Sequence, residues 1–205
     1  MRRISLALAA SLAAMLSASA ASVQREYTYF SIGGSTLSEI EQELNRRGPT
    51  VSTTNRRHPG ATRMEFTTRV TYGETAGRCG VVAATVALNA NMILPRWRRP
   101  GGTETDVRLI WDTLSADIRR HEESHVVIAR NHARELETAL KQIAGQESCE
   151  EAQARVQETS SRILDRHEAE QARFDRIESV NFESRMLRLL EYRMERIGNG
   201  QLPPP

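Results

Sequence analysis

Apolar side chains in the carboxyl-terminal half of the chain recur every three to four residues, a spacing that predicts amphipathic helices. The first run starts near Thr105 and its apolar stripe passes through Ile110, Leu114, Ile118, His121, His125, Ile128, His132, Leu136, Ala139 and Ile143. Gly145 interrupts it. A second run starts near Glu150 and carries Val156, Ile163, His167, Phe174, Ile177, Leu187 and Leu190. Two such helices with a short connection predict an antiparallel hairpin.

The amino-terminal half shows strand patterns instead. Runs that are rich in aromatic and β-branched residues, or that alternate in polarity, predict strands over residues 26–32, 61–72 and 79–94. Thr36-Leu37-Ser38-Glu39 has the pattern of a capping box and predicts a short helix ending at Gly48-Pro49. Residues 51–60 show no period and are expected to form a loop.

These patterns predict one α+β domain over residues 21–197. A small antiparallel β-sheet with one short helix is expected over residues 21–97, followed by a long antiparallel α-helical hairpin over residues 104–197. The sheet is too small to stand alone, so it needs cover from the hairpin. Residues 198–205 end in three prolines and are expected to be disordered.

The first 20 residues have the pattern of a secretory signal peptide. Arg2 and Arg3 precede an apolar run from Ile4 to Leu16, and Ala18-Ser19-Ala20 offers a cleavage site. The apolar run is too short for a permanent membrane helix, so we expect a secreted or periplasmic protein without a stable membrane anchor. An uncleaved amino-terminal anchor is the alternative.

Charge argues against a nucleic-acid partner. The formal net charge of the sequence is +2, and removal of Arg2 and Arg3 takes it to 0. A near-neutral chain lacks the basic footprint that attracts nucleic acid or anionic membranes. The oligomeric state stays open.

The two cysteines, Cys79 and Cys149, both follow the predicted cleavage site. An even count in an exported chain predicts a disulfide, which would join the two halves. Free thiols are the alternative, because a thiolate metal site would need more cysteines at closer spacing.

Residues His121-Glu122-Glu123-Ser124-His125 form an H-E-x-x-H motif inside the first predicted helix. Residues four apart share a helix face, so His121 and His125 can offer two nitrogens to one Zn²⁺. Glu122 would lie beside the metal and act as the general base. A charged helix that carries two histidines by chance is the alternative.

The third zinc ligand is ambiguous. A hairpin that turns near Glu147 places residues 169–173 opposite the motif, within about one helical turn, so His167, Glu170 and Asp175 are candidates. Each of the three could instead be an ordinary core or solvated residue. His132 lies about 10 Å along the helix from His125 and is expected in the core or behind the ligands.

The chain resembles a bacterial family catalogued as domain of unknown function 922 and described as predicted secreted zinc-dependent proteases. The resemblance rests on the motif at 121–125 together with Tyr29-Phe30-Ser31-Ile32-Gly33-Gly34, Gly48-Pro49, Cys79, Leu94-Pro95-Arg96-Trp97, Trp111 and Cys149. It implies His121 and His125 as ligands and Glu122 as base. Phe174-Asp175 resembles an aromatic-Asp pair of the family, but the Thr-x-His-Gly expected soon after it is absent.

We therefore expect a zinc-dependent hydrolase that acts on a peptide or protein substrate. Two alternatives stay open. An amidase acting on a non-peptide or cell-wall amide would use the same chemistry. An inactive family member could act as a periplasmic binding or assembly protein, since the third ligand lacks a clear motif.

Overall fold

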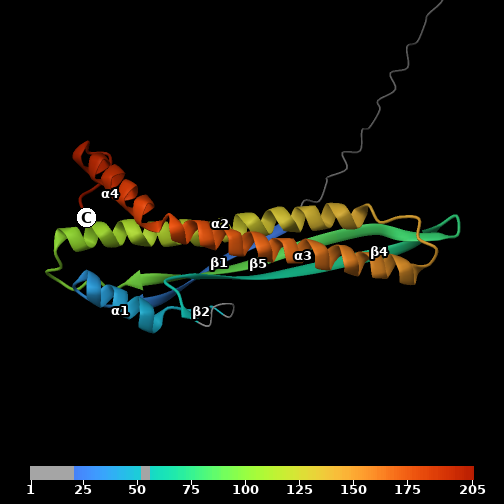
Figure 1. Cartoon of the computed structure of the whole chain (residues 1–205), viewed down its shortest axis with the longest axis horizontal. Helices are drawn as coiled ribbons and strands as arrows, with labels where there is room; N and C mark the ends of the chain where they lie inside the picture. Colours follow the sequence, from blue (N-terminus) through green and yellow to red (C-terminus); the bar gives the residue numbers. More distant parts are fainter. Residues whose placement is uncertain (1–20, 52–55) are drawn as a thin grey trace, which may run out of the picture.

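The computed structural model describes residues 21–51 and 56–205 (Figure 1), so the predicted signal peptide lies outside the described residues. The α+β class is confirmed. The elements in chain order are β1 (Ser22–Ile32), α1 (Leu37–Arg47), β2 (Thr50–Val51), β3 (Arg56–Arg57), β4 (Ala61–Thr75), β5 (Arg78–Trp97), α2 (Thr105–Lys141), α3 (Cys149–Val180) and α4 (Phe182–Gly198).

The main sheet is mixed, so the prediction of an antiparallel sheet was wrong. Its strand order is β1-β5-β4, in which β4 pairs antiparallel and β1 pairs parallel with the central strand β5. The chain turns directly from β4 to β5 at Ala76 and Gly77, which both have positive φ, as tight hairpins require. Between β1 and β5, by contrast, it passes through α1 and β4, which is long enough for a parallel crossover.

The predicted loop at residues 51–60 is more regular than expected on either side of residues 52–55, which lie outside the described residues. β2 and β3 form a small antiparallel pair, Thr50 opposite Arg57 and Val51 opposite Arg56. Two residues per strand are too few to show alternation in a sequence. The predicted capping box is confirmed, because Thr36 accepts from the Glu39 N–H and the Glu39 side chain accepts from the Thr36 N–H.

Helices α2 and α3 form the predicted antiparallel hairpin and run along the sheet (Figure 1). The helix predicted from Glu150 is divided in two, because α3 ends at Val180 and α4 begins at Phe182. Asn181 closes α3 by donating its backbone N–H and its side-chain amide to the Ile177 carbonyl. Beyond this point α4 projects away from the hairpin, beside the start of α2 (Figure 1).

The core lies between β5 and α2. Alternate residues of β5 are buried against the helices, among them Val86, Leu88 and Met92. On α2, Ala129 and Ala133 are fully buried, and these small side chains let the helix approach the sheet closely. No helix among residues 21–51 and 56–205 is long and apolar enough to cross a membrane. The expected disorder of residues 198–205 stays a prediction.

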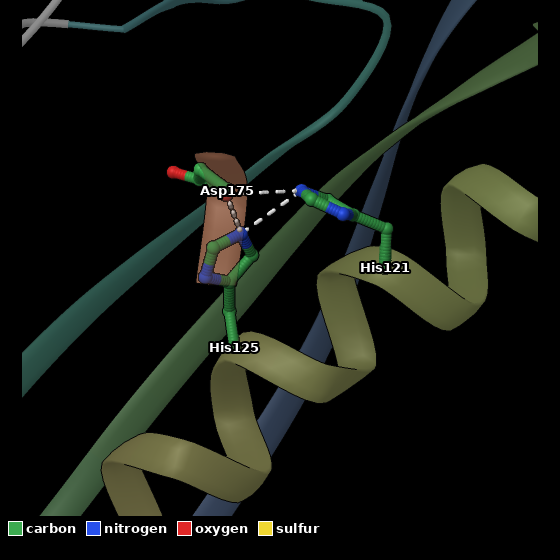
Figure 2. Close-up of side chains that lie close together, drawn as sticks. All are labelled: His121, His125 and Asp175. Carbon is green, nitrogen blue, oxygen red and sulfur yellow. Dashed lines mark hydrogen bonds and ion pairs between the residues drawn. The ribbon is translucent and has the colours of Figure 1, made fainter. Parts of the chain in front are cut away.

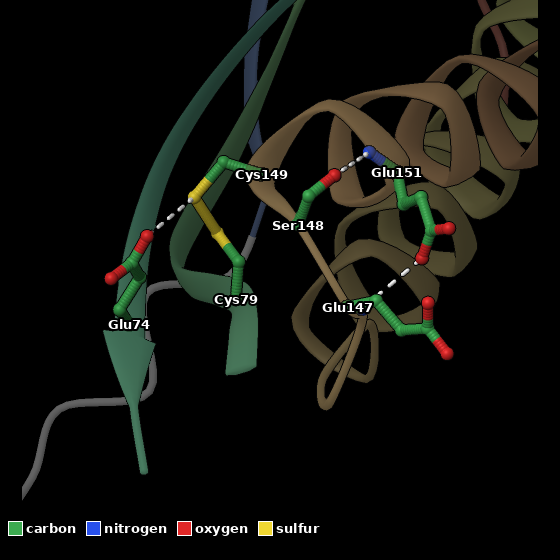
Figure 3. Close-up of a disulfide and its surroundings, with 6 residues drawn as sticks. All are labelled: Glu74, Cys79, Glu147, Ser148, Cys149 and Glu151. Carbon is green, nitrogen blue, oxygen red and sulfur yellow. Dashed lines mark hydrogen bonds between the residues drawn. A yellow bond between two sulfur atoms is a disulfide. The ribbon is translucent and has the colours of Figure 1, made fainter. Parts of the chain in front are cut away.

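The predicted disulfide between Cys79 and Cys149 is present (Figure 3). It joins the start of β5 to the start of α3, at the end of the molecule where the hairpin turns. Cys79 also exchanges two backbone hydrogen bonds with Gln146, of 3.0 and 2.8 Å. The covalent bond and the hydrogen bonds together hold the first turn of α3 against the sheet. A disulfide is consistent with a secreted or periplasmic protein.

Replacement of both cysteines by serine should lower the free energy of unfolding by about 4 kcal/mol, because the bond closes a loop of 70 residues. Urea denaturation measures the change. The parent protein in reducing agent is the matched control and should lose a similar amount. A loss below about 1 kcal/mol in both would contradict a stapling role for the bond.

Candidate metal centre

Two imidazoles and one carboxylate converge between α2 and α3. His121 and His125 lie one turn apart on the same face of α2, and Asp175 reaches them from α3 (Figure 2). The two Nε2 atoms are 3.0 Å apart. Asp175 Oδ1 lies 3.3 Å from Nε2 of His121 and 3.0 Å from Nε2 of His125. Within residues 21–51 and 56–205 this is the one group of three such side chains close enough to share an ion.

The triangle of ligand atoms fits a tetrahedral zinc ion. Zn–N and Zn–O bonds of about 2.0–2.2 Å at tetrahedral angles put neighbouring ligand atoms about 3.3 Å apart. The separations here are 3.0, 3.0 and 3.3 Å. Nitrogen and oxygen donors are also the ligand types that zinc takes in catalytic sites, which leave a fourth position open. Residues and spacing therefore suit the ion.

The other nitrogen of each imidazole faces an acceptor. His125 Nδ1 lies 2.5 Å from Gln171 Oε1, and His121 Nδ1 lies 3.5 Å from Glu178 Oε2. Both acceptors favour the tautomer that carries its hydrogen on Nδ1. The Nε2 lone pairs are then directed at the centre, as in histidines that bind metals.

The ionisation of the centre suits a cation. Burial alone would raise the pKa of Asp175, but without a metal the protonated imidazoles of His121 and His125 donate to it from Nε2, and these bonds hold the pKa well below its usual range. Burial opposes charge on His125 as well, yet the bonds to Asp175 and Gln171 raise its pKa. Asp175 is therefore a carboxylate at neutral pH, and a metal has to displace a proton that the site otherwise attracts.

Glu122 lies on α2 between the two histidines and is almost fully buried. Burial raises its pKa, against the opposing effects of a hydrogen bond from Thr62 and of the neighbouring histidines. Thr62 Oγ1 donates to Glu122 Oε2 at 2.8 Å. Gly60 packs so closely that a Cβ atom there would lie 2.8 Å from Glu122 Oε1. The start of β4 thus fixes the position of this carboxyl group.

His167 and Glu170 lie outside the group formed by His121, His125 and Asp175. Glu170 pairs with His132 at 2.8 Å. His167 Nε2 accepts from the side-chain amide of Gln171 at 2.8 Å, and the same amide also donates to the His125 carbonyl at 3.1 Å. His167 therefore fixes the orientation of Gln171, whose oxygen in turn holds His125.

Sequence reasoning missed Gln171 and Glu178, the two residues behind the histidines. Neither residue type stands out on a charged helix. Only their positions could have identified them. Gln171 falls inside the range 169–173 that is predicted to lie opposite the motif, and Asp175 and Glu178 follow at helical spacing on the same face of the helix. The H-E-x-x-H motif alone contains no information about them.

The family described as bacterial protein of unknown function (DUF922) matches residues 27–182. The chain belongs to the DUF922 family. The match spans the strands of both sheets from residue 27 on, helices α1 to α3 and all the residues of the candidate centre. The description of DUF922 names no activity. No curated protein and no solved structure matches the chain.

Acid should weaken the fold through His167. Its pKa is lowered to about 4, first by burial and then by the charge of His132. An unfolded histidine binds a proton below about pH 6.5. Between these values the unfolded chain holds the proton and the folded chain does not, so stability is full above pH 6.5 and falls as the pH drops toward 4. The full loss from this group is about 3 kcal/mol.

Urea denaturation of EDTA-treated protein between pH 4 and 7 measures this loss. The variant His167→Gln keeps an acceptor for Gln171 and should show a shallower pH dependence than the parent. Equal slopes for the two proteins would contradict the assignment to His167.

Proposed function

We propose that the chain is a zinc-dependent hydrolase that cleaves peptide bonds. His121, His125 and Asp175 are the proposed ligands and Glu122 the general base. The observation that carries the proposal is the direction of the two imidazoles, because each has an acceptor on Nδ1 and turns Nε2 toward Asp175 Oδ1. Buried core histidines would also need an acceptor for one N–H, but they would not need both inner nitrogens within 3.3 Å of one carboxylate oxygen.

The residues around the proposed zinc ion would each have a separate role in the reaction. Bound zinc would supply a Lewis acid that acidifies water and stabilises negative charge on the substrate. Glu122 takes the proton from the attacking water and passes it to the leaving amine. Its burial and its raised pKa suit a group that must hold a proton between these steps. Thr62 holds one carboxyl oxygen through a hydrogen bond, and the backbone of Gly60 lies close to the other oxygen.

The surroundings favour an extended peptide as substrate over a compact amide. The side chain of Asp175 is about half exposed at 55%, and that of His121 is partly exposed, so the centre is open to solvent. β4 is an edge strand of the main sheet and begins beside Glu122. An edge strand can pair its free backbone groups with an extended chain. We place this activity outside the cytoplasm, in agreement with the disulfide.

Zinc analysis and a cleavage assay test the proposal together. The purified parent should hold about one zinc per chain, and His121→Ala and Asp175→Ala should hold little. His132→Gln is the matched control, since it changes a histidine of the same helix outside the centre. Glu122→Gln should keep zinc and lose at least a hundredfold in the rate of casein hydrolysis, the scale expected for a general base.

The possible outcomes separate the alternatives. A parent without zinc, with His121→Ala indistinguishable from it, would reject the metal site. The amidase would be favoured if the protein holds zinc and hydrolyses no protein substrate, but releases amine from a cell-wall amide in a reaction that needs Glu122. Zinc with neither activity would favour an inactive member that binds or assembles other proteins.

Gln171 should affect zinc affinity without being a ligand. Gln171→Leu removes the acceptor from His125 Nδ1 and should weaken zinc binding 10- to 100-fold, the usual effect of losing a residue that supports a ligand. Gln171→Glu keeps an acceptor oxygen and should lose less. Competition with a zinc-binding dye gives the dissociation constants. Equal affinities for the parent and the leucine variant would contradict this role.

A further inference from the structure

A buried carboxylate stands at the amino-terminal end of β1. Ala21, which precedes the strand, is only 8% exposed and packs in the core with Val86. β1 begins at Ser22, opposite Ala87 in the parallel register with β5. One residue earlier on β5, Val86 donates its backbone N–H to Glu137 Oε2 at 3.0 Å. Because β4 occupies the opposite side of β5, the carboxylate lies in the place where β1 would continue.

Glu137 comes from α2 and is 5% exposed. Its other oxygen accepts from Lys141 Nζ at 2.6 Å. Together with Ser22 and Val86, Glu137 lines a hollow of about 240 Å³ at this end of the strand, and Arg69 lines it as well. A buried carboxylate needs charged or polar donors. Because Glu137 lines this hollow, a further donor has space to approach its side chain.

The predicted cleavage after Ala20 creates such a donor. Hydrolysis of the Ala20–Ala21 peptide bond by a signal peptidase leaves the hydroxyl of water on the Ala20 carboxyl group and a hydrogen on the Ala21 nitrogen. The new α-amino group binds a further proton below about pH 8. A charged amine next to a residue that packs in the core, as Ala21 does, is stabilised where a carboxylate accepts it.

We propose that Glu137 is the binding site for the α-amino group of Ala21, and that removal of the signal peptide completes this ion pair. The inference rests on the predicted cleavage site and is independent of the zinc proposal. In the precursor the Ala21 nitrogen is a neutral amide, so only the mature chain can form the pair. Among the residues that the structure describes, Lys141 and Arg69 are the other charged groups that face Glu137 or the hollow.

The Ala21 amine can be labelled and observed selectively, because Lys141 is the only lysine of the sequence. The exported protein therefore carries only two amines, and reductive methylation with ¹³C-formaldehyde labels both while keeping their charge. Intact mass should first show that the protein begins at Ala21. An NMR titration should then give the methylated Ala21 amine a pKa at least one unit above that of the same methylated amine in the urea-unfolded protein, which is a tenfold tighter hold on the proton.

The variant Glu137→Gln should return the pKa of the methylated amine to its value in the unfolded protein, whereas the control Glu135→Gln, two residues away on α2, should leave it raised. If Glu137→Gln does not fold, the labelled parent still decides, since the methyl groups on Ala21 should show nuclear Overhauser contacts to Glu137. A mature chain that begins at another residue, an ordinary pKa in the parent, or a raised pKa in Glu137→Gln would each overturn the proposal.

Discussion

The register of α3 against α2 is the constraint on which the candidate centre depends. With this register Asp175 faces His121 and His125, Gln171 faces His125, and Glu178 faces His121. A shift of one residue would turn α3 by about 100° and carry every one of these groups away. The disulfide at Cys149 sets the register at one end. Close packing between α2 and α3 maintains the same register from the disulfide to the candidate metal centre.

The sequence predicted the helices well because a long amphipathic run has few other structures open to it. The sequence could not predict the direction of β1 relative to β5, because alternation of polar and apolar residues looks the same in parallel and antiparallel strands. The break at Asn181 was also hidden, because apolar residues such as Leu187 and Leu190 continue the helical period into α4. Tertiary contacts determine both the direction of β1 and the position of the helix break, and the local sequence pattern does not.

The candidate site likewise has a part that could be predicted from the sequence and a part that could not. The spacing of His121, Glu122 and His125 is local, so the sequence displays it directly. A partner from the second helix depends on the length of the connection, and an error of one turn left His167, Glu170 and Asp175 within reach, with His167 favoured because it lies on the apolar stripe. The structure distinguishes them by direction, because Asp175 points at the imidazoles while His167 bonds to Gln171 and Glu170 to His132.

Three buried acids on α2 show how one helix organises the molecule. Asp117, Glu122 and Glu137 are each about 5% exposed or less, and buried carboxylates are retained where donors compensate them. Glu137 accepts from the backbone of Val86 within β5, and Glu122 from Thr62 at the start of β4. Asp117 accepts from Arg185 at 3.1 Å and so attaches α4 to α2.

The attachment of α4 reaches the candidate centre. Arg185 contacts Asp117 and also lies 3.4 Å from Glu178, the residue whose carboxylate faces Nδ1 of His121. Arg120 holds the same carboxylate from α2. Burial would raise the pKa of Glu178, but Arg120 and Arg185 outweigh it and lower the pKa. The carboxylate is therefore an ionised acceptor 3.5 Å from Nδ1 of His121, which favours a hydrogen on that nitrogen. The helix that leaves the body of the fold is therefore joined, through Arg185 and Glu178, to a proposed zinc ligand.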